Sequence, residues 1–222
     1  MRKIDKSVVL STVYEQWLHN LEQTQEPHGK YKSSHEFYKD IVMSLYHCQN
    51  GLCAYTERRL CENESFDSSN WQIGQFTTNF PKTEGQLEHF DPTLKINKAY
   101  LWDNLFMVLG KANNDKGEKS IDMILKPDAA NYDPFRLLDY DFVLDLFIPN
   151  TYLEPTEKER VKYMIDTLFM NADYVKLHRK PFLRKIKAQI ELGRMMTWED
   201  VEEPKQFPTS FEMLRRERTT SQ

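Results

Sequence analysis

The spacing of apolar residues changes along this chain of 222 residues and limits the folds that the chain can adopt. Near the start, Leu10, Val13, Trp17 and Leu21 recur at intervals of three and four, which indicates an amphipathic helix. The last third returns to helical spacing. From about 51 to 120, however, the apolar runs are short and broken by Asn, Gly, Pro and Asp. The pattern predicts an α+β fold with a small strand-containing core embedded in a mainly helical domain.

This change of pattern divides the sequence into three stretches. We expect an N-terminal helical segment over 1–50, the strand-containing core over 51–120, and a mixed and then helical region over 121–222. No internal repeat or low-complexity linker separates them, so the sequence favours a single compact domain overall.

Several local signals predict where elements begin and end. A second helix is expected after Ser33, where Glu36 completes a capping box. A short helix is expected over 101–109, and strands are expected around 120–125 and 141–149.

The last third carries two further helix signals. Thr156 is the expected N-cap of one helix, with Glu159 in the capping-box position. A second helix is expected over 172–193, where Pro181 marks either a kink or a restart, and its apolar residues are Leu177, Phe182, Ile186 and Ile190.

Composition excludes some classes of protein. No run of eighteen apolar residues is present, so no membrane span is expected. The N-terminal residues lack a secretory signal, and the three cysteines, an odd number close together, favour reduced thiols in the cytoplasm. A net charge of -4 argues against strong autonomous binding to nucleic acid. It leaves open a nuclease whose partner or local patch supplies positive charge.

Four short segments of the middle region carry residues suited to chemistry. They read CAYTE at 53–57, LEHFDP at 87–92, WDNL at 102–105 and ANNDKG at 112–117. His89 alone could be a half-buried structural histidine. Asn104, however, follows it by 15 residues and Asn113 by 9 more. Together the segments have the order and spacing of an HNH endonuclease core.

The residue types fit the hydrolysis of a phosphodiester. A histidine of near-neutral pKa can take a proton from the attacking water. A neighbouring carboxylate and an amide oxygen are hard ligands suited to Mg²⁺ or Mn²⁺. A further asparagine can hold the histidine or its loop in place.

The sequence resembles the PtuB-like family, the HNH nuclease subunit of Septu and retron anti-phage defence systems. That family carries Cys-x-Tyr-Cys-Glu, Glu-His-Phe-x-Pro, Trp-x-Asn-Leu and Cys-Asn-x-x-Lys-Gly in this order. The corresponding residues here are 53–57, 88–92, 102–105 and 112–117. The segments at 131–134 and 168–182 extend the similarity over roughly residues 40 to 185.

The resemblance implies a ββα-metal fold for the core and a role for each matching residue. His89 would be the general base, Glu88 and Asn113 would bind Mg²⁺ or another divalent cation such as Mn²⁺, and Asn104 would orient the His89 loop. Asn113 is preferred to its neighbour because it precedes the Lys-Gly pair by the family's interval. The possible supporting residues are Glu57, Asn114 and Lys116, although Glu57 could equally be a surface charge.

A structural zinc ion, which many relatives hold with two Cys-x-x-Cys pairs, is expected to be absent. Here the first pair reads Cys53-x-x-Thr56 and the second reads Leu109-x-x-Ala112. Tetrahedral zinc needs four ligands, so the missing thiolates predict apolar packing instead. One alternative remains open, a rebuilt site that uses His47, Cys48 and Cys61.

The resemblance also implies partners and a setting. They are a PtuA-like ATPase subunit, a nucleic-acid substrate and, in retron systems, a reverse transcriptase with its RNA-DNA product, all in the cytoplasm. The basic residues Lys176, Arg179 and Lys180 are either a solvated helix face or a weak nucleic-acid contact. Two alternatives to a DNA-cutting enzyme stay open: a ribonuclease acting on tRNA, and a weakly active module that mainly docks an ATPase.

Overall fold

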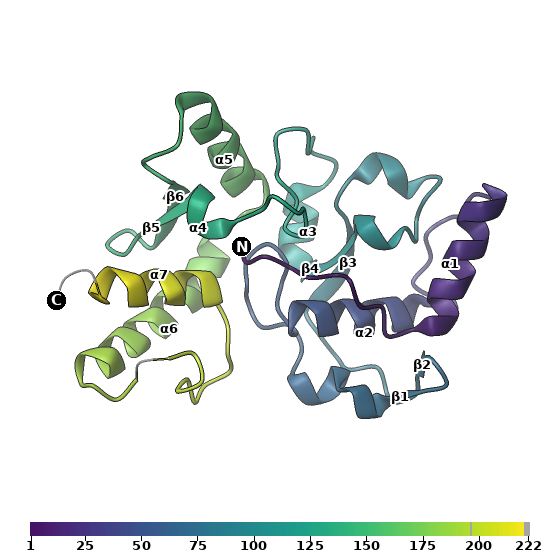
Figure 1. Cartoon of the computed structure of the whole chain (residues 1–222), viewed down its shortest axis with the longest axis horizontal. Helices are drawn as coiled ribbons and strands as arrows, with labels where there is room; N and C mark the ends of the chain where they lie inside the picture. Colours follow the sequence, from purple (N-terminus) through teal and green to yellow (C-terminus); the bar gives the residue numbers. More distant parts are fainter. Residues whose placement is uncertain (196, 220–222) are drawn as a thin grey trace. The chain divides into compact units, whose positions relative to one another are not determined.

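The computed structural model describes residues 1–195 and 197–219 and has a mixed α+β fold, which confirms the predicted class (Figure 1). The chain divides into two compact units. The N-terminal unit comprises residues 4–54 and 60–121; the C-terminal unit comprises residues 1–3, 55–59 and those from 122 onward. No helix formed by the described residues is long and apolar enough to cross a bilayer.

Two helices open the N-terminal unit. Helix α1 (Thr12–Thr24) follows Ser11, whose hydroxyl accepts a hydrogen bond from the Tyr14 amide at 3.2 Å and caps the helix. Helix α2 (Tyr38–Gln49) buries eight of its twelve residues. The expected capping box is wrong, because residue Phe37 stands at the N-cap without a side-chain cap, and its amide donates to the His35 ring at 3.3 Å.

The middle of this unit contains two antiparallel strand pairs. A short hairpin joins β1 (Trp71–Gln72) to β2 (Gln75–Phe76). Strand β3 (Gly85–His89) pairs with β4 (Leu105–Leu109), with His89 opposite Leu105. Helix α3 (Gly110–Lys116) follows β4 directly. The order is therefore strand, strand, helix within 32 residues of chain, from 85 to 116.

The helix expected over 101–109 is wrong. Residues Trp102–Asn104 form one 3-10 turn, and the following five residues are a strand whose side chains are all buried. A short apolar run is compatible with a helix or a strand, so the residues that it contacts determine which of the two it forms. Here the Gln49 side chain exchanges two hydrogen bonds with the Met107 backbone, at 2.7 and 2.8 Å, and ties β4 to the end of α2.

The C-terminal unit packs a hairpin against helices. Its elements are α4 (Pro134–Leu137), β5 (Leu138–Asp141), β6 (Leu146–Pro149), α5 (Pro155–Thr167), α6 (Asp173–Glu191) and α7 (Pro208–Thr219). No strand forms over 120–125, and the strand expected over 141–149 is instead the turn and second strand of the β5–β6 hairpin.

Two helix predictions in this unit also need correction. Helix α5 begins two residues earlier than expected, with Glu154 rather than Thr156 at the N-cap and Pro155 in the first turn, where its fixed φ suits a helix start. Helix α6 continues through Pro181. Leu177 is 74% exposed and does not belong to the buried face.

Candidate functional site

Strand β3 and helix α3 meet through two polar contacts. The amide nitrogen of Asn113 donates to the Gln86 Oε1 at 3.1 Å, and Lys116 Nζ lies 2.7 Å from Glu88 Oε1. Residues two apart on a strand share a face, as do residues three apart on a helix. The Gln86 and Glu88 face of β3 therefore lies against the Asn113 and Lys116 face of α3, with Glu88 buried and Gln86 exposed.

The Glu88–Lys116 pair is deeply buried. The two side chains are 6% and 0% exposed, so both charges have lost most of their hydration. Within the described residues, no well-aligned hydrogen bond reaches Lys116 Nζ. The close approach of the carboxylate is thus the main compensation for burying the Lys116 charge.

His89 ends β3 and is held from two sides. Its Nε2 lies 2.8 Å from the Ala99 carbonyl oxygen, and its ring meets the Tyr31 ring edge-on with centroids 5.1 Å apart. A carbonyl oxygen can only accept, so Nε2 carries the proton of this hydrogen bond. In the neutral ring, Nδ1 then holds a lone pair that can accept a proton.

The surroundings of His89 favour its neutral form. Burial lowers its pKa from 6.5 to about 4, the hydrogen bond to Ala99 opposes this shift, and the charges of Lys95 and Lys116 add to it. His89 is therefore neutral near pH 7, as a general base must be, but its pKa lies below the near-neutral value expected from the sequence, which makes it a weaker proton acceptor.

Asn104 fixes the loop that leaves His89. Its Oδ1 accepts from the Asp91 amide at 2.8 Å and its Nδ2 donates to the Asp91 carbonyl at 3.0 Å. The Phe90 amide donates to the Asn104 carbonyl at 2.9 Å, and the Asn104 side chain is buried. These contacts tie the loop after β3 to the start of β4. The catalytic consequence of this role stays a prediction.

The donor set near α3 is compatible with a divalent cation. Glu88 offers a carboxylate and half-buried Asn113 an amide oxygen, and hard oxygen ligands of this kind suit Mg²⁺ and Mn²⁺. Of the two adjacent asparagines, Asn113 bonds to β3 and Asn114 is exposed. Across the described residues, no three His, Cys, Asp or Glu side chains gather as a metal site. A cation here would rest on two protein ligands and water, after Glu88 exchanges its contact with Lys116.

Cys53 is the one cysteine left of the two Cys-x-x-Cys pairs that hold zinc in the family that the sequence resembles. Cys53 is buried, and its sulfur accepts a hydrogen bond from the Leu109 amide at 3.2 Å. His47, Cys48 and Cys61 form no three-residue cluster in the part of the chain that the structure describes. The absence of structural zinc stays a prediction.

Glu57 has a structural role in the C-terminal unit. It is 1% exposed, and its carboxylate accepts from the Thr209 amide at 2.9 Å and from the Thr209 hydroxyl. These contacts cap the start of α7. Glu57 is therefore a buried capping residue and not a surface charge, and its supporting role at the site stays a prediction.

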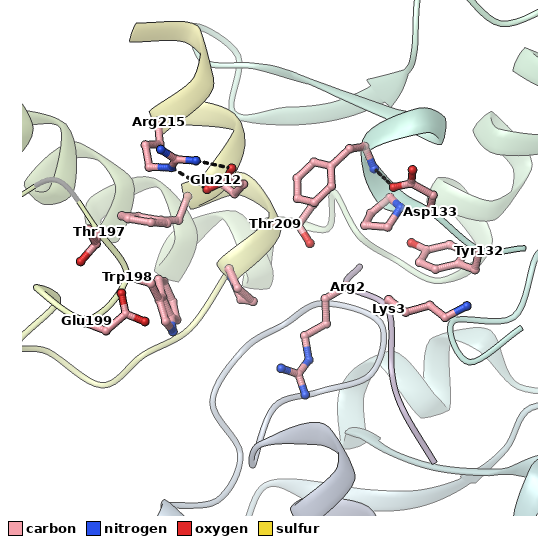
Figure 2. A pocket seen from close by; sticks show the side chains of 14 residues that line it. Arg2, Lys3, Tyr132, Asp133, Thr197, Trp198, Glu199, Thr209, Glu212 and Arg215 are labelled. Carbon is pink, nitrogen blue, oxygen red and sulfur yellow. Dashed lines mark hydrogen bonds and ion pairs between the residues drawn. The ribbon is translucent and has the colours of Figure 1, made fainter. Parts of the chain in front are cut away.

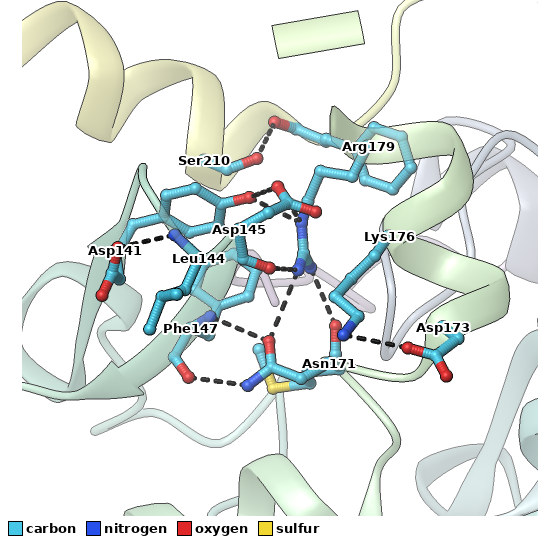
Figure 3. Close-up of polar contacts among 12 residues, drawn as sticks. Asp141, Leu144, Asp145, Phe147, Asn171, Asp173, Lys176, Arg179 and Ser210 are labelled. Atoms are coloured by element: carbon cyan, nitrogen blue, oxygen red, sulfur yellow. Dashed lines mark hydrogen bonds and ion pairs between the residues drawn. The ribbon is translucent and has the colours of Figure 1, made fainter. Parts of the chain in front are cut away.

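Arg179 also needs correction. It is 0% exposed, and its guanidinium bonds to the Tyr140 hydroxyl, the Met170 carbonyl and the Asp145 carbonyl, each at 2.8 Å (Figure 3). A side chain buried in this way cannot touch a nucleic acid on the surface. Lys176 and Lys180 remain partly exposed.

The C-terminal unit contains a groove that no sequence motif indicated. Figure 2 shows it between the start of α7, the N-terminal residues and the segment that carries Trp198. Its volume is about 630 Å³, and Phe135 and Phe211 add to its aromatic lining. Its charged rim is mixed, with Glu212 paired to Arg215 at 2.8 Å, and does not select a ligand.

The chain matches no protein-family model and no curated protein sequence.

Proposed function

We propose that this chain is a metal-dependent HNH endonuclease whose ββα-metal core is the β3–β4–α3 segment. The observation that carries the proposal is the orientation of His89, whose buried ring is held by the Ala99 carbonyl oxygen so that Nδ1 can accept a proton. The adjacent Glu88 and the Asn113 opposite β3 supply the two oxygen ligands that the motif requires.

In this proposal the residues of the chain divide the work of hydrolysis. His89 Nδ1 takes a proton from a water molecule as the water oxygen bonds to phosphorus, and the ester oxygen leaves with a proton from solvent. Asn104 keeps the loop after His89 in place through Asp91. When bound, a Mg²⁺ or Mn²⁺ ion held by Glu88 and Asn113 would stabilise negative charge on the phosphate. Lys116 would then add positive charge beside Glu88.

We also propose the setting that the sequence motifs imply. The chain would be the effector subunit of a cytoplasmic, ATPase-associated anti-phage system of Septu or retron type. Its partners would be a PtuA-like ATPase and, in the retron case, a reverse transcriptase with its RNA-DNA product. A net charge of -4 suits a nuclease that binds substrate weakly until a partner recruits it.

A second candidate is a weakly active module that mainly docks the ATPase. The contact that favours it is the buried Glu88–Lys116 pair, because an internal ammonium neutralises the proposed metal ligand. In that case His89→Ala would leave phage defence intact, while disruption of the helical regions would abolish it.

The test is a cleavage assay of the chain with its ATPase partner on plasmid DNA and on total tRNA. We expect cleavage of plasmid with Mg²⁺ or Mn²⁺ and none with EDTA. Attack by water requires no 2′-hydroxyl, so the proposed chemistry permits either DNA or RNA as substrate. Cleavage of tRNA alone would identify a ribonuclease. Cleavage that persists in EDTA would contradict the metal mechanism.

A further inference from the structure

The tip of the β5–β6 hairpin displays large aliphatic side chains to solvent. Val143 is 83% exposed and Leu144 60%, and Leu177 on α6 is 74% exposed. Leu144 and Leu177 border the same hollow of about 350 Å³, together with Pro181. An exposed apolar cluster on a folded unit marks a site of interaction more often than single exposed side chains do.

Several hydrogen bonds hold this tip in place (Figure 3). One carboxylate oxygen of Asp141 accepts from the Val143 and Leu144 amides, both at 2.9 Å. The buried Arg179 then fixes the far end of the turn through the Asp145 carbonyl. The position of Leu144 is therefore set before any partner arrives, which reduces the entropy lost on binding.

The hollow has a basic rim along α6. Lys176, Lys180 and Arg184 line it at intervals of four residues, and so they share one face of the helix. Lys176 pairs with Asp173 at 2.9 Å. Neither Lys180 nor Arg184 forms an ion pair within the described part of the chain. The rim thus offers two cations to an acidic ligand.

We propose that this hollow docks an acidic segment of a partner protein, which inserts an aliphatic side chain between Leu144 and Leu177 and places carboxylates on Lys180 and Arg184. The apolar part of the lining favours protein over nucleic acid, because bases bind by stacking on aromatic rings and the apolar residues here, Leu144, Leu177 and Pro181, include none. The proposal does not depend on whether the N-terminal unit cuts nucleic acid.

The experiment measures fluorescence anisotropy with the full chain and a labelled synthetic helical peptide of Glu and Leu. The variants are Leu144→Ser/Leu177→Ser and Lys180→Glu/Arg184→Glu. We expect each to weaken peptide binding about tenfold or more. The matched controls are Leu192→Ser, at another exposed leucine (66% exposed), and Lys162→Glu on the exposed face of α5, and both should bind like wild type. Circular dichroism melting verifies that all variants fold.

Two further ligands test whether the hollow binds by charge alone or binds nucleic acid instead. A peptide with every Leu replaced by Ser should bind at least about tenfold more weakly than the parent peptide. A single-stranded oligonucleotide should not compete with the parent peptide. The proposal is overturned if wild type does not bind the parent peptide, if the Ser peptide binds equally well, or if the oligonucleotide competes. Equal weakening by the control variants also overturns it.

Discussion

Lys116 Nζ lies 2.7 Å from Glu88 Oε1, and both side chains are buried between β3 and α3. The Lys116 ammonium therefore contacts one oxygen of the Glu88 carboxylate, which we propose as a metal ligand. A divalent cation can use Glu88 fully only if this contact is exchanged, so Lys116 links the stability of the core to metal binding.

Replacing Lys116 by Met is expected to destabilise the protein by about 3–5 kcal/mol, because the buried Glu88 carboxylate loses the ammonium that lies 2.7 Å from it. Urea denaturation measures this change. The control is Lys111→Met, whose ion pair with Asp115 is largely exposed and 3.9 Å long. It should change stability by less than about 1 kcal/mol.

The same variant tests the link to metal. Mn²⁺ should raise the melting temperature of Lys116→Met more than that of wild type, since Glu88 is then available to the ion. An equal rise in both proteins would show that Lys116 does not compete with metal.

Asn104→Ala removes both hydrogen bonds to Asp91 and leaves the Asp91 backbone groups to find other partners. We expect a loss of about 1–3 kcal/mol of unfolding free energy. Asn114→Ala, at an exposed position of α3, should stay within about 0.5 kcal/mol of wild type. Similar losses in the two variants would argue against a special role of Asn104 in holding the loop.

Stability should fall as the pH drops below about 6.5, in part because of His28. Burial lowers its pKa, with opposing influence from Glu22 and an additional lowering by Lys98. The unfolded chain then binds a proton at His28 before the folded chain does, so acid favours unfolding. In addition, His28 Nδ1 accepts from the Tyr100 amide at 3.2 Å and would lose this bond when protonated.

His28→Asn keeps an acceptor without a titrating group. Thermal melts between pH 7 and pH 5 should show a smaller loss of stability in this variant than in wild type. A slope as steep as that of wild type would assign the acid sensitivity to other groups.

Arg179→Met is expected to cost about 3–5 kcal/mol, because Asp145 and the surrounding carbonyls are buried around the guanidinium. Arg184→Met, at an exposed position of the same helix, should be within about 0.5 kcal/mol of wild type. If chemical denaturation finds Arg179→Met as stable as wild type, the packing role assigned to this residue is wrong.

The sequence predicted the α+β class and the residues that gather at β3 and α3, but it misassigned the element between them. Residues 105–109 are five apolar residues in a row, and their spacing does not distinguish a helix from a strand. Pairing with β3 and the contacts of Gln49 decide for a strand. Such partners are distant in sequence and cannot be read from the run itself.

The buried charged residues were also not predicted from the sequence, although the sequence around Arg179 contains a pattern that indicates its burial. Val175, Arg179, Phe182 and Ile186 recur at helical spacing, and all four are buried on α6. The stripe could have placed Arg179 inside. No comparable pattern connects Lys116 with Glu88, 28 residues earlier, because their contact depends on how α3 folds back on β3.

The central claim is that His89 is the base of a hydrolytic site, and the most direct measurement is the single-turnover rate of plasmid cleavage by the chain with its ATPase partner and Mn²⁺. We predict that His89→Ala lowers this rate by about 10²–10⁴-fold, while His19→Ala, at an exposed histidine of α1, cleaves like wild type. A His89→Ala protein that folds and cleaves at the wild-type rate would contradict the account.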